Sequence, residues 1–169
     1  MVAALACSLF PGCSGPKGNE GGKEIKHIPV NDSSEIISGY GVVTDRDITS
    51  DGNGSLKITT TIPTTVRLFQ LADIDIEKAF LVYQARLRTE DFDGEAYLEM
   101  ICSFPGKGEF FSRGVNDVLS GTSDWTTVST RFRCEEGQNP DMVKLNLVAY
   151  GKGTVWIDDI RLLESPLAR

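Results

Sequence analysis

The sequence has little of what most enzymes use. It contains a single histidine, His27, and four cysteines among 169 residues. This histidine lies beside the polar N-terminal stretch. The sequence therefore predicts no histidine metal cluster and no serine–histidine–acid or cysteine–histidine catalytic set. The glycine-rich segment 105–108 lacks the lysine and hydroxyl residue that end a phosphate loop. We therefore expect a protein that is not an enzyme, with a small glycan-cleaving enzyme, which needs only two carboxylates across a cleft, as a distant alternative.

Basic residues are also few. Lysine and arginine total 17 against 24 aspartates and glutamates, which gives a formal net charge of −7. A nucleic-acid-binding surface needs a basic footprint, so this class of partner is not expected. No apolar run is long enough to predict a transmembrane helix. What is present is a 40% hydrophobic composition with 17 glycines and 7 prolines, which suits one domain of short strands and turns.

The N-terminal residues have the pattern of an export signal. Residues 2–10 are apolar and rich in small side chains, Cys13 follows, and 14–24 form a polar, flexible linker. This arrangement resembles the end of a bacterial lipoprotein signal peptide, which implies lipidation of Cys13, with Cys7 as the alternative. No basic residue precedes the apolar run, so segment 1–13 is expected to be a truncated signal. We expect an exported protein, anchored by lipid in a bacterial cell envelope and facing the periplasm or the exterior.

From residue 25 to 164 the pattern is that of strands, without a convincing helix. Apolar and polar residues alternate clearly in 79–88, 95–104, 125–134 and 143–150. We also expect strands at 24–30, 36–43, 54–62, 66–71 and 109–113, and a short tail at 165–169. Many short alternating strands predict an all-β fold, an antiparallel sandwich of two sheets.

The final strands are predicted to form a hairpin around Gly151–Gly153. This turn would pair Ala149 with Val155, and a β-bulge at Asp158 and Asp159 would absorb the change of phase that follows. A two-residue turn without a bulge is the alternative.

Cys102 and Cys134 fall on core-facing positions of their strands. An exported protein sits where disulfides persist, so a bridge between them is one interpretation. Two separate buried thiols are the other.

Three segments carry a family resemblance. In order and spacing, 51–58, 123–126 and 155–160 resemble the galactose-binding-like jelly roll of bacterial carbohydrate-binding modules. The resemblance implies a structural calcium ion, held by Asp158 or Asp159, carbonyls of residues 50–54 and Asp51. Independently, a carboxylate on a half-buried strand needs a partner, and a cation is a natural one. The alternative is that the two aspartates cap backbone amides or meet Arg161.

Outward-facing residues of the alternating strands are predicted to form one polar face that binds carbohydrate. Tyr97, Tyr150 and Trp156 would stack on sugar rings, while Arg86, Glu99 and Asn146 would bind hydroxyl groups. The alternative is a solvated surface of weak ion pairs. The expected partner is thus a glycan; the rival function is a structural or protein-interaction lipoprotein domain that binds an envelope protein and no sugar.

Overall fold

The computed structural model of the chain describes residues 22–38 and 41–167. The predicted signal segment, including Cys13 and Cys7, lies outside the described residues. None of the described residues belongs to a helix that is long and apolar enough to cross a membrane.

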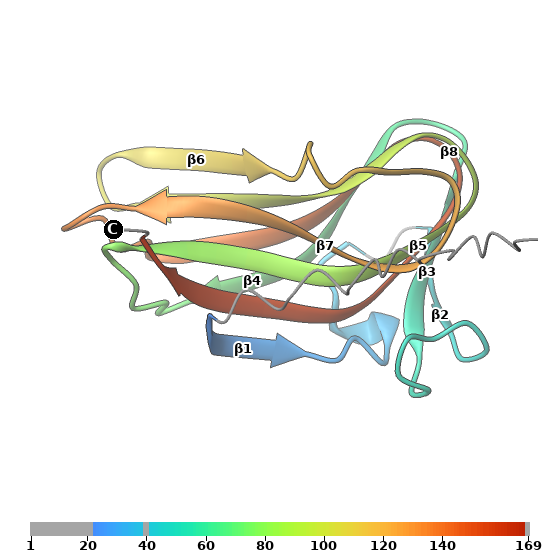
Figure 1. Ribbon diagram of the computed structural model, residues 1–169, viewed down its shortest axis with the longest axis horizontal. Helices are drawn as coiled ribbons and strands as arrows, with labels where there is room; N and C mark the ends of the chain where they lie inside the picture. The colour runs from blue at the N-terminus through green and yellow to red at the C-terminus, as the bar shows by residue number, and fades with distance from the viewer. Residues whose placement is uncertain (1–21, 39–40, 168–169) are drawn as a thin grey trace, which may run out of the picture.

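The described residues form an antiparallel β-structure with one 3₁₀ turn (Figure 1). This confirms the predicted all-β sandwich. β1 begins at Lys23, before the predicted domain start at residue 25, and the last strand continues to Pro166. The predicted strand at 36–43 is wrong, because its described residues 36–38 follow the 3₁₀ turn without strand structure and only 42–43 belong to β2. The elements are β1 (Lys23–Ile28), η1 (Ser33–Glu35), β2 (Val42–Asp45), β3 (Ser55–Thr60), β4 (Thr64–Ala72), β5 (Ala79–Phe104), β6 (Gly108–Arg113), β7 (Leu119–Cys134) and β8 (Met142–Pro166).

Two long strands, β5 and β8, run through both layers of the sandwich. In the front layer, the first half of β5 pairs with the last half of β8. β7 pairs with this half of β5, and β3 and β1 pair with this half of β8. In the back layer, the last half of β5 pairs with the first half of β8. β6 pairs with this half of β5, and β4 pairs with this half of β8. Both strands curve together at the right-hand end of Figure 1. The sequence pattern predicted four separate strands here, whereas the structure has two bent ones.

Glycines make this bend possible, and the predicted hairpin at Gly151–Gly153 is wrong. At the bend the two backbones cross so closely that a side chain on Gly94 would collide with the carbonyl oxygen of Tyr150. Gly94 also has a φ of 141°, which L side chains rarely adopt. The chain therefore continues instead of reversing, and Ala149 pairs with Ala96 of β5 instead of Val155.

The predicted β-bulge in β8 is confirmed. Between the pairs Gln84–Arg161 and Arg86–Asp158, β8 has one residue more than β5, and Asp159 adopts a left-handed φ of 49°. The extra residue restores the phase, so Ile157 and Ile160 both reach the core.

The core lies between the two layers and contains most of the residues that alternation predicted; Thr126, which was expected to face inward, is exposed. Leu81, Leu98 and Leu147 are among its fully buried members. Cys102 and Cys134 also face the core, and both are free thiols in the structure. Burial raises the pKa of Cys102 to about 12 and that of Cys134 to about 11.

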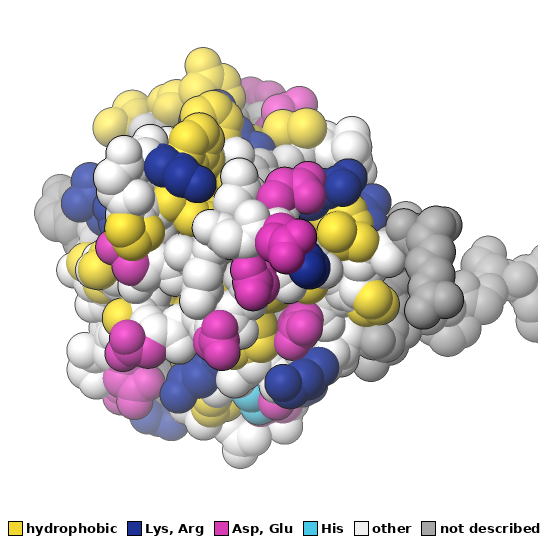
Figure 2. All heavy atoms as spheres, turned by 90° about the vertical axis from the view of Figure 1, so that its left-hand side faces the viewer, with side chains coloured by type: hydrophobic (Ala, Val, Ile, Leu, Met, Phe, Trp, Pro, Cys, Tyr) yellow, Lys and Arg dark blue, Asp and Glu magenta, His cyan; other side chains and the backbone are white. Residues whose placement is uncertain are grey.

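An exposed apolar patch lies at the edge strand β6. Hydrophobic side chains gather at the top of the face in Figure 2, over this strand, where Phe110 and Phe111 are 47% and 63% exposed. The guanidinium of Arg113 lies 4.5 Å from the ring centroid of Phe111 and partly covers it.

Candidate functional site

The predicted polar face is divided between two opposite surfaces of the sandwich. Arg86 lies on the front layer, opposite Thr127 of β7. Glu99 and Asn146 lie opposite each other in the back layer. The prediction of a single face is wrong, because outward residues before and after the bend in β5 belong to different layers.

Glu99 and Asn146 are occupied with each other and with Arg113. Asn146 Nδ2 donates to Glu99 Oε1 at 3.2 Å, and Arg113 Nε donates to Glu99 Oε2 at 2.7 Å. Both residues are buried, with 8% and 5% exposure. Their arrangement is that of a satisfied polar network in the sheet surface rather than an open set of sugar-binding groups.

Trp156 cannot be a stacking platform, contrary to the prediction. It faces away from the core as the bulge requires, yet it is fully buried. Its cross-strand neighbours Lys57 and Arg88 place their cationic groups 5.2 and 5.8 Å from the ring centroid. The indole Nε1 donates to Asp45 Oδ2 at 2.9 Å. Long neighbouring side chains thus cover the ring, an effect that strand alternation does not reveal.

Tyr150 and Tyr97 lie on the back layer, away from Arg86. Tyr150 is 63% exposed, and Tyr97 is half-buried. The pairs Glu95–Tyr150 and Tyr97–Val148 make the two tyrosines diagonal neighbours near the bend.

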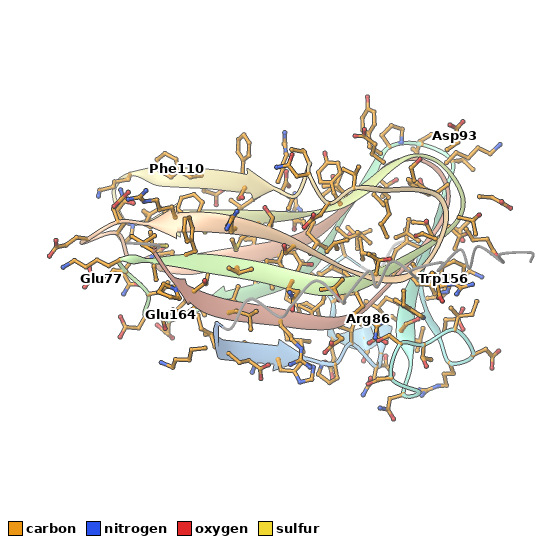
Figure 3. All side chains as sticks on the ribbon, in the orientation of Figure 1. Glu77, Arg86, Asp93, Phe110, Trp156 and Glu164 are labelled. Carbon is orange, nitrogen blue, oxygen red and sulfur yellow. The ribbon has the colours of Figure 1, made fainter. Side chains whose placement is uncertain are left out.

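A groove of about 770 Å³ lies on the outer surface of the front layer. Arg86, labelled in Figure 3, belongs to its floor. The floor combines outward residues of three adjacent strands, and segment 112–117 forms a wall. The floor includes Val82, Gln84 and Arg86 of β5, Thr127, Ser129 and Arg131 of β7, and Asp159, Arg161 and Leu163 of β8. Arg86 and Asp159 were predicted as site residues, and Gln84, Thr127 and Arg131 were expected only as members of the outward polar face. The other floor residues were not predicted, and their alternation was the available signal.

The wall is fastened to β7 by side-chain hydrogen bonds. Ser112 Oγ donates to the carbonyl oxygen of Arg131 at 2.7 Å. Asp117 Oδ2 accepts from the amide and hydroxyl groups of Ser129 at 3.3 and 3.1 Å. A side chain at Gly114 would lie 2.7 Å from the carbonyl oxygen of Ser129, so glycine permits the close approach. The groove is therefore held in shape by the fold.

The two aspartates of the bulge point to different sites. Asp159 lines the groove, where its Oδ1 lies 2.7 Å from His27 Nε2 and accepts from Arg161 Nε at 3.1 Å. Asp158 instead faces the glycine turn, and its Oδ2 accepts from the amide of Ser50 at 2.8 Å. The predicted meeting of the last strand with this turn is thus present in the structure.

Asp158 is a fully buried carboxylate. Burial raises its pKa; hydrogen bonds from Ser50 and Asp159 oppose this rise, and the negative charge of Asp51 adds to it. Asp51 itself accepts from the amide and side chain of Asn53 at 2.8 and 3.0 Å, and these bonds lower its pKa.

Two further buried oxygens belong to this region. Asn31 Oδ1 and Ser50 Oγ have no hydrogen-bond partner among the described residues. A side chain at Gly54 would lie 2.9 Å from the carbonyl oxygen of Asn31, which places this residue against the turn. Within the described ranges, no three histidine, cysteine or carboxylate side chains gather to hold a metal ion. The sequence interpretation missed Asn31, because nothing in the pattern links residue 31 to the turn.

Comparisons with known proteins were informative only at the level of structure. No protein-family sequence model matches the chain, and no curated protein sequence does. The chain is similar to the CBM22-1 xylan-binding domain of Paenibacillus barcinonensis Xyn10C, with 13% identity, a TM-score of 0.55, and coverage of 89% of this chain and 100% of that domain.

Two other solved modules have the same architecture. A family 16 carbohydrate-binding module matches with 13% identity and a TM-score of 0.55, over 79% of this chain and 96% of the module. TmCBM61, solved with β-1,4-galactotriose, matches with 13% identity and a TM-score of 0.50, over 75% and 83%. The chain thus has the β-sandwich fold of carbohydrate-binding modules, which confirms the predicted resemblance at the level of fold.

Proposed function

We propose that this protein is a non-catalytic carbohydrate-binding module and that its ligand lies in the groove on the front layer. The observation that carries the proposal is the groove itself, about 770 Å³ in volume and lined mainly by polar side chains on a sandwich of the carbohydrate-binding-module fold. Fold alone does not establish function, so the proposal depends on the chemistry of these side chains.

The groove has the groups that hydroxyl recognition needs. Gln84 lies at its centre, opposite Ser129 of β7 and Arg161 of β8. The Gln84 amide supplies both donors and an acceptor for sugar hydroxyls, and the Ser129 hydroxyl, which donates to Asp117, remains an acceptor. Because they stand on paired strands, few side chains must be ordered when a ligand binds.

The carboxylates of the groove support binding rather than catalysis. Asp117 accepts hydrogen bonds from Ser129, and Asp159 is held by His27 and Arg161. Both carboxylates therefore position other protein groups. An assay for product release from polysaccharides tests the enzymatic alternative directly.

Calorimetric titration against a broad glycan panel tests the binding function. We expect saturable binding that Gln84→Ala weakens by about tenfold, the effect of losing roughly one to two hydrogen bonds. Tyr150→Ala, on the back layer, is expected to leave the affinity unchanged. Loss of binding only in Tyr150→Ala would move the site to the back layer. No binding to any glycan would favour the rival function, a protein-interaction or structural domain.

We also propose that the turn beside Asp158 holds a structural calcium ion. Calcium binds carboxylate, amide and carbonyl oxygens. The buried carboxylate of Asp158 and the unpartnered amide oxygen of Asn31 fit this preference. Asp51 adds negative charge nearby. When bound, the ion would offset the buried charge and stiffen the turn; it would take no part in chemistry.

Export and lipid anchoring remain proposals from the sequence. The apolar segment 2–10 and Cys13 support them. Metabolic labelling with a fatty acid in a bacterial host would test them, with Cys13→Ala and Cys7→Ala compared. Label that is lost only in Cys13→Ala is the expected result, and label retained in both variants would contradict the proposal.

A further inference from the structure

The groove is cationic, although the protein is acidic. Four arginines and two aspartates line it, in a chain with a formal net charge of −7. None of the described residues that line it is tryptophan, tyrosine, phenylalanine or histidine. Stacking on an aromatic face is a common means of holding a neutral sugar ring. This groove offers charge and hydrogen bonds in its place.

Two of the four arginines are already neutralised by acidic partners. Arg113 Nε lies 2.7 Å from Glu99 Oε2. Arg161 lies 2.9 Å from Glu24 Oε2 and 3.0 Å from Asp159 Oδ1. These guanidinium groups have most of their binding capacity taken by the protein.

The other two arginines, Arg86 and Arg131, have no carboxylate within ion-pair distance among the described residues. Arg86 makes one long hydrogen bond, from Nη2 to the carbonyl oxygen of Trp125 at 3.4 Å, and its buried Nε has no partner in the described part of the chain. Arg131 is exposed, with its guanidinium 5.4 Å from the ring centroid of Phe80. A guanidinium without a partner in a groove is suited to a carboxylate or sulfate, which it can bind with two parallel hydrogen bonds.

The two free arginines are spaced along the strands. Arg131 lies opposite Val82, four positions before Arg86 on β5. At about 3.3 Å per residue, the Cα positions are separated by about 13 Å along the groove. A chain with repeated negative charges meets both groups, whereas a small anion meets only one.

From this arrangement we infer that the groove selects anionic polysaccharides, whose uronate carboxylates or sulfate esters pair with Arg86 and Arg131. The inference rests on the proposed glycan-binding function and specifies its ligand class. Because the contacts are ionic and partly exposed, affinity should fall as the salt concentration rises.

The test is titration with matched polymers and matched variants. Polygalacturonate is compared with carboxyl-reduced polygalacturonate, which has the same backbone without charge, and with neutral β-1,4-galactan. A sulfated galactan distinguishes sulfate from carboxylate as the recognised group, and polyglutamate reports non-specific attraction to a polyanion. We expect one or both acidic glycans to bind at least about tenfold more tightly than the neutral polymers and than polyglutamate.

The variants are Arg86→Gln and Arg131→Gln, with Arg67→Gln as the control. Arg67 is an exposed arginine on β4, outside the groove, so the control changes the net charge equally. Each groove variant should lose roughly tenfold in affinity for the acidic glycan, and the control should lose less than about twofold. Arg131 is on the surface, so its variant remains informative if Arg86→Gln impairs folding.

Four outcomes would overturn the inference. If neutral galactan binds in the groove as tightly as the acidic polymers, the groove binds glycans but does not select for charge. Equal losses of affinity in all three variants, or binding of polyglutamate as tight as that of the acidic glycans, would show that affinity depends on net charge alone. Absence of binding to every polymer overturns both the inference and the proposed function.

Discussion

Trp156 Nε1 donates a 2.9 Å hydrogen bond to Asp45 Oδ2, and this bond joins residues that lie 111 positions apart. It ties the end of β2 to the middle of β8 on the outer surface of the front layer. Although burial opposes the effect, this bond and those from the amides of Ile48 and Asp47 lower the pKa of Asp45.

Trp156→Phe is therefore expected to lower the free energy of unfolding by about 2–4 kcal/mol, because a hydrogen bond to a charged group and some packing are lost. Since the folded-state pKa of Asp45 is lowered, its contribution is present above the unfolded pKa of about 3.9 and is lost as the pH falls through the lower folded value. Urea unfolding below about pH 4 should thus show a smaller difference between the two proteins than at pH 7.

Asp45→Asn is the matched control. It keeps an acceptor for the indole and removes the charge, so its stability should lack this acid-dependent step. A difference between wild type and Trp156→Phe that stays constant from pH 7 to acid would show that the indole does not stabilise the carboxylate form.

Bound calcium should remove the pH dependence that Asp158 contributes to the free energy of unfolding. Without the ion, the raised folded-state pKa means that stability is present below the unfolded pKa and is lost as the pH rises through the folded value. With the ion, the carboxylate form is stabilised and this loss disappears. A ligand at about 100 times its Kd stabilises by about 2.7 kcal/mol. Thermal melts in EDTA and in calcium at several pH values measure the effect.

Asp158→Asn should abolish the calcium response, and Asp159→Asn, next in the chain but turned toward the groove, should retain it. Equal melting temperatures of the wild type in EDTA and in calcium would exclude a structural ion in the turn.

The crossing of β5 and β8 should tolerate no side chain. Gly94→Ala places a methyl group against the carbonyl of Tyr150 at a φ of 141°, whereas Gly106→Ala at a φ of 70° meets open space. We expect a loss of about 3 kcal/mol or more for the first and about 1 kcal/mol for the second, by urea unfolding. Similar losses for both variants would mean that the strands do not cross this closely.

Cys102 and Cys134 should resist alkylation in the folded protein at pH 8. Both are buried, and burial holds their pKa values near 12 and 11, so little thiolate is present. Iodoacetamide labelling with peptide mapping separates them from Cys7 and Cys13. Both should react in urea; reaction in urea only after reduction would instead show a disulfide.

Strand alternation predicted most core positions of the long strands, whereas Ile74 and Ile76 join the core from a segment that was expected to be a loop. Alternation identified Leu81, Leu98 and Leu147 as inward-facing, and the change of phase after Ile157 indicated the bulge at Asp158 and Asp159. These predictions succeeded because a one-residue shift moves every side chain to the opposite face, so the pattern itself records the register.

The site was less predictable, because alternation distinguishes core-facing from solvent-facing residues but does not show to which of the two outer surfaces a solvent-facing residue belongs. Arg86 and Glu99 both face outward, yet the bend at Gly94 places them on different layers. The burial of Trp156 by Lys57 and Arg88, and the position of Asn31 beside Gly54, depend on long-range pairing that no local pattern contains.

The passage of β5 and β8 through both layers has a mechanical consequence. One layer cannot separate as a whole while the other stays intact, because β5 and β8 are central strands of both layers. The central amides of both strands should consequently exchange with deuterium only when the whole molecule opens. A force applied to either long strand would then be distributed over the entire sandwich.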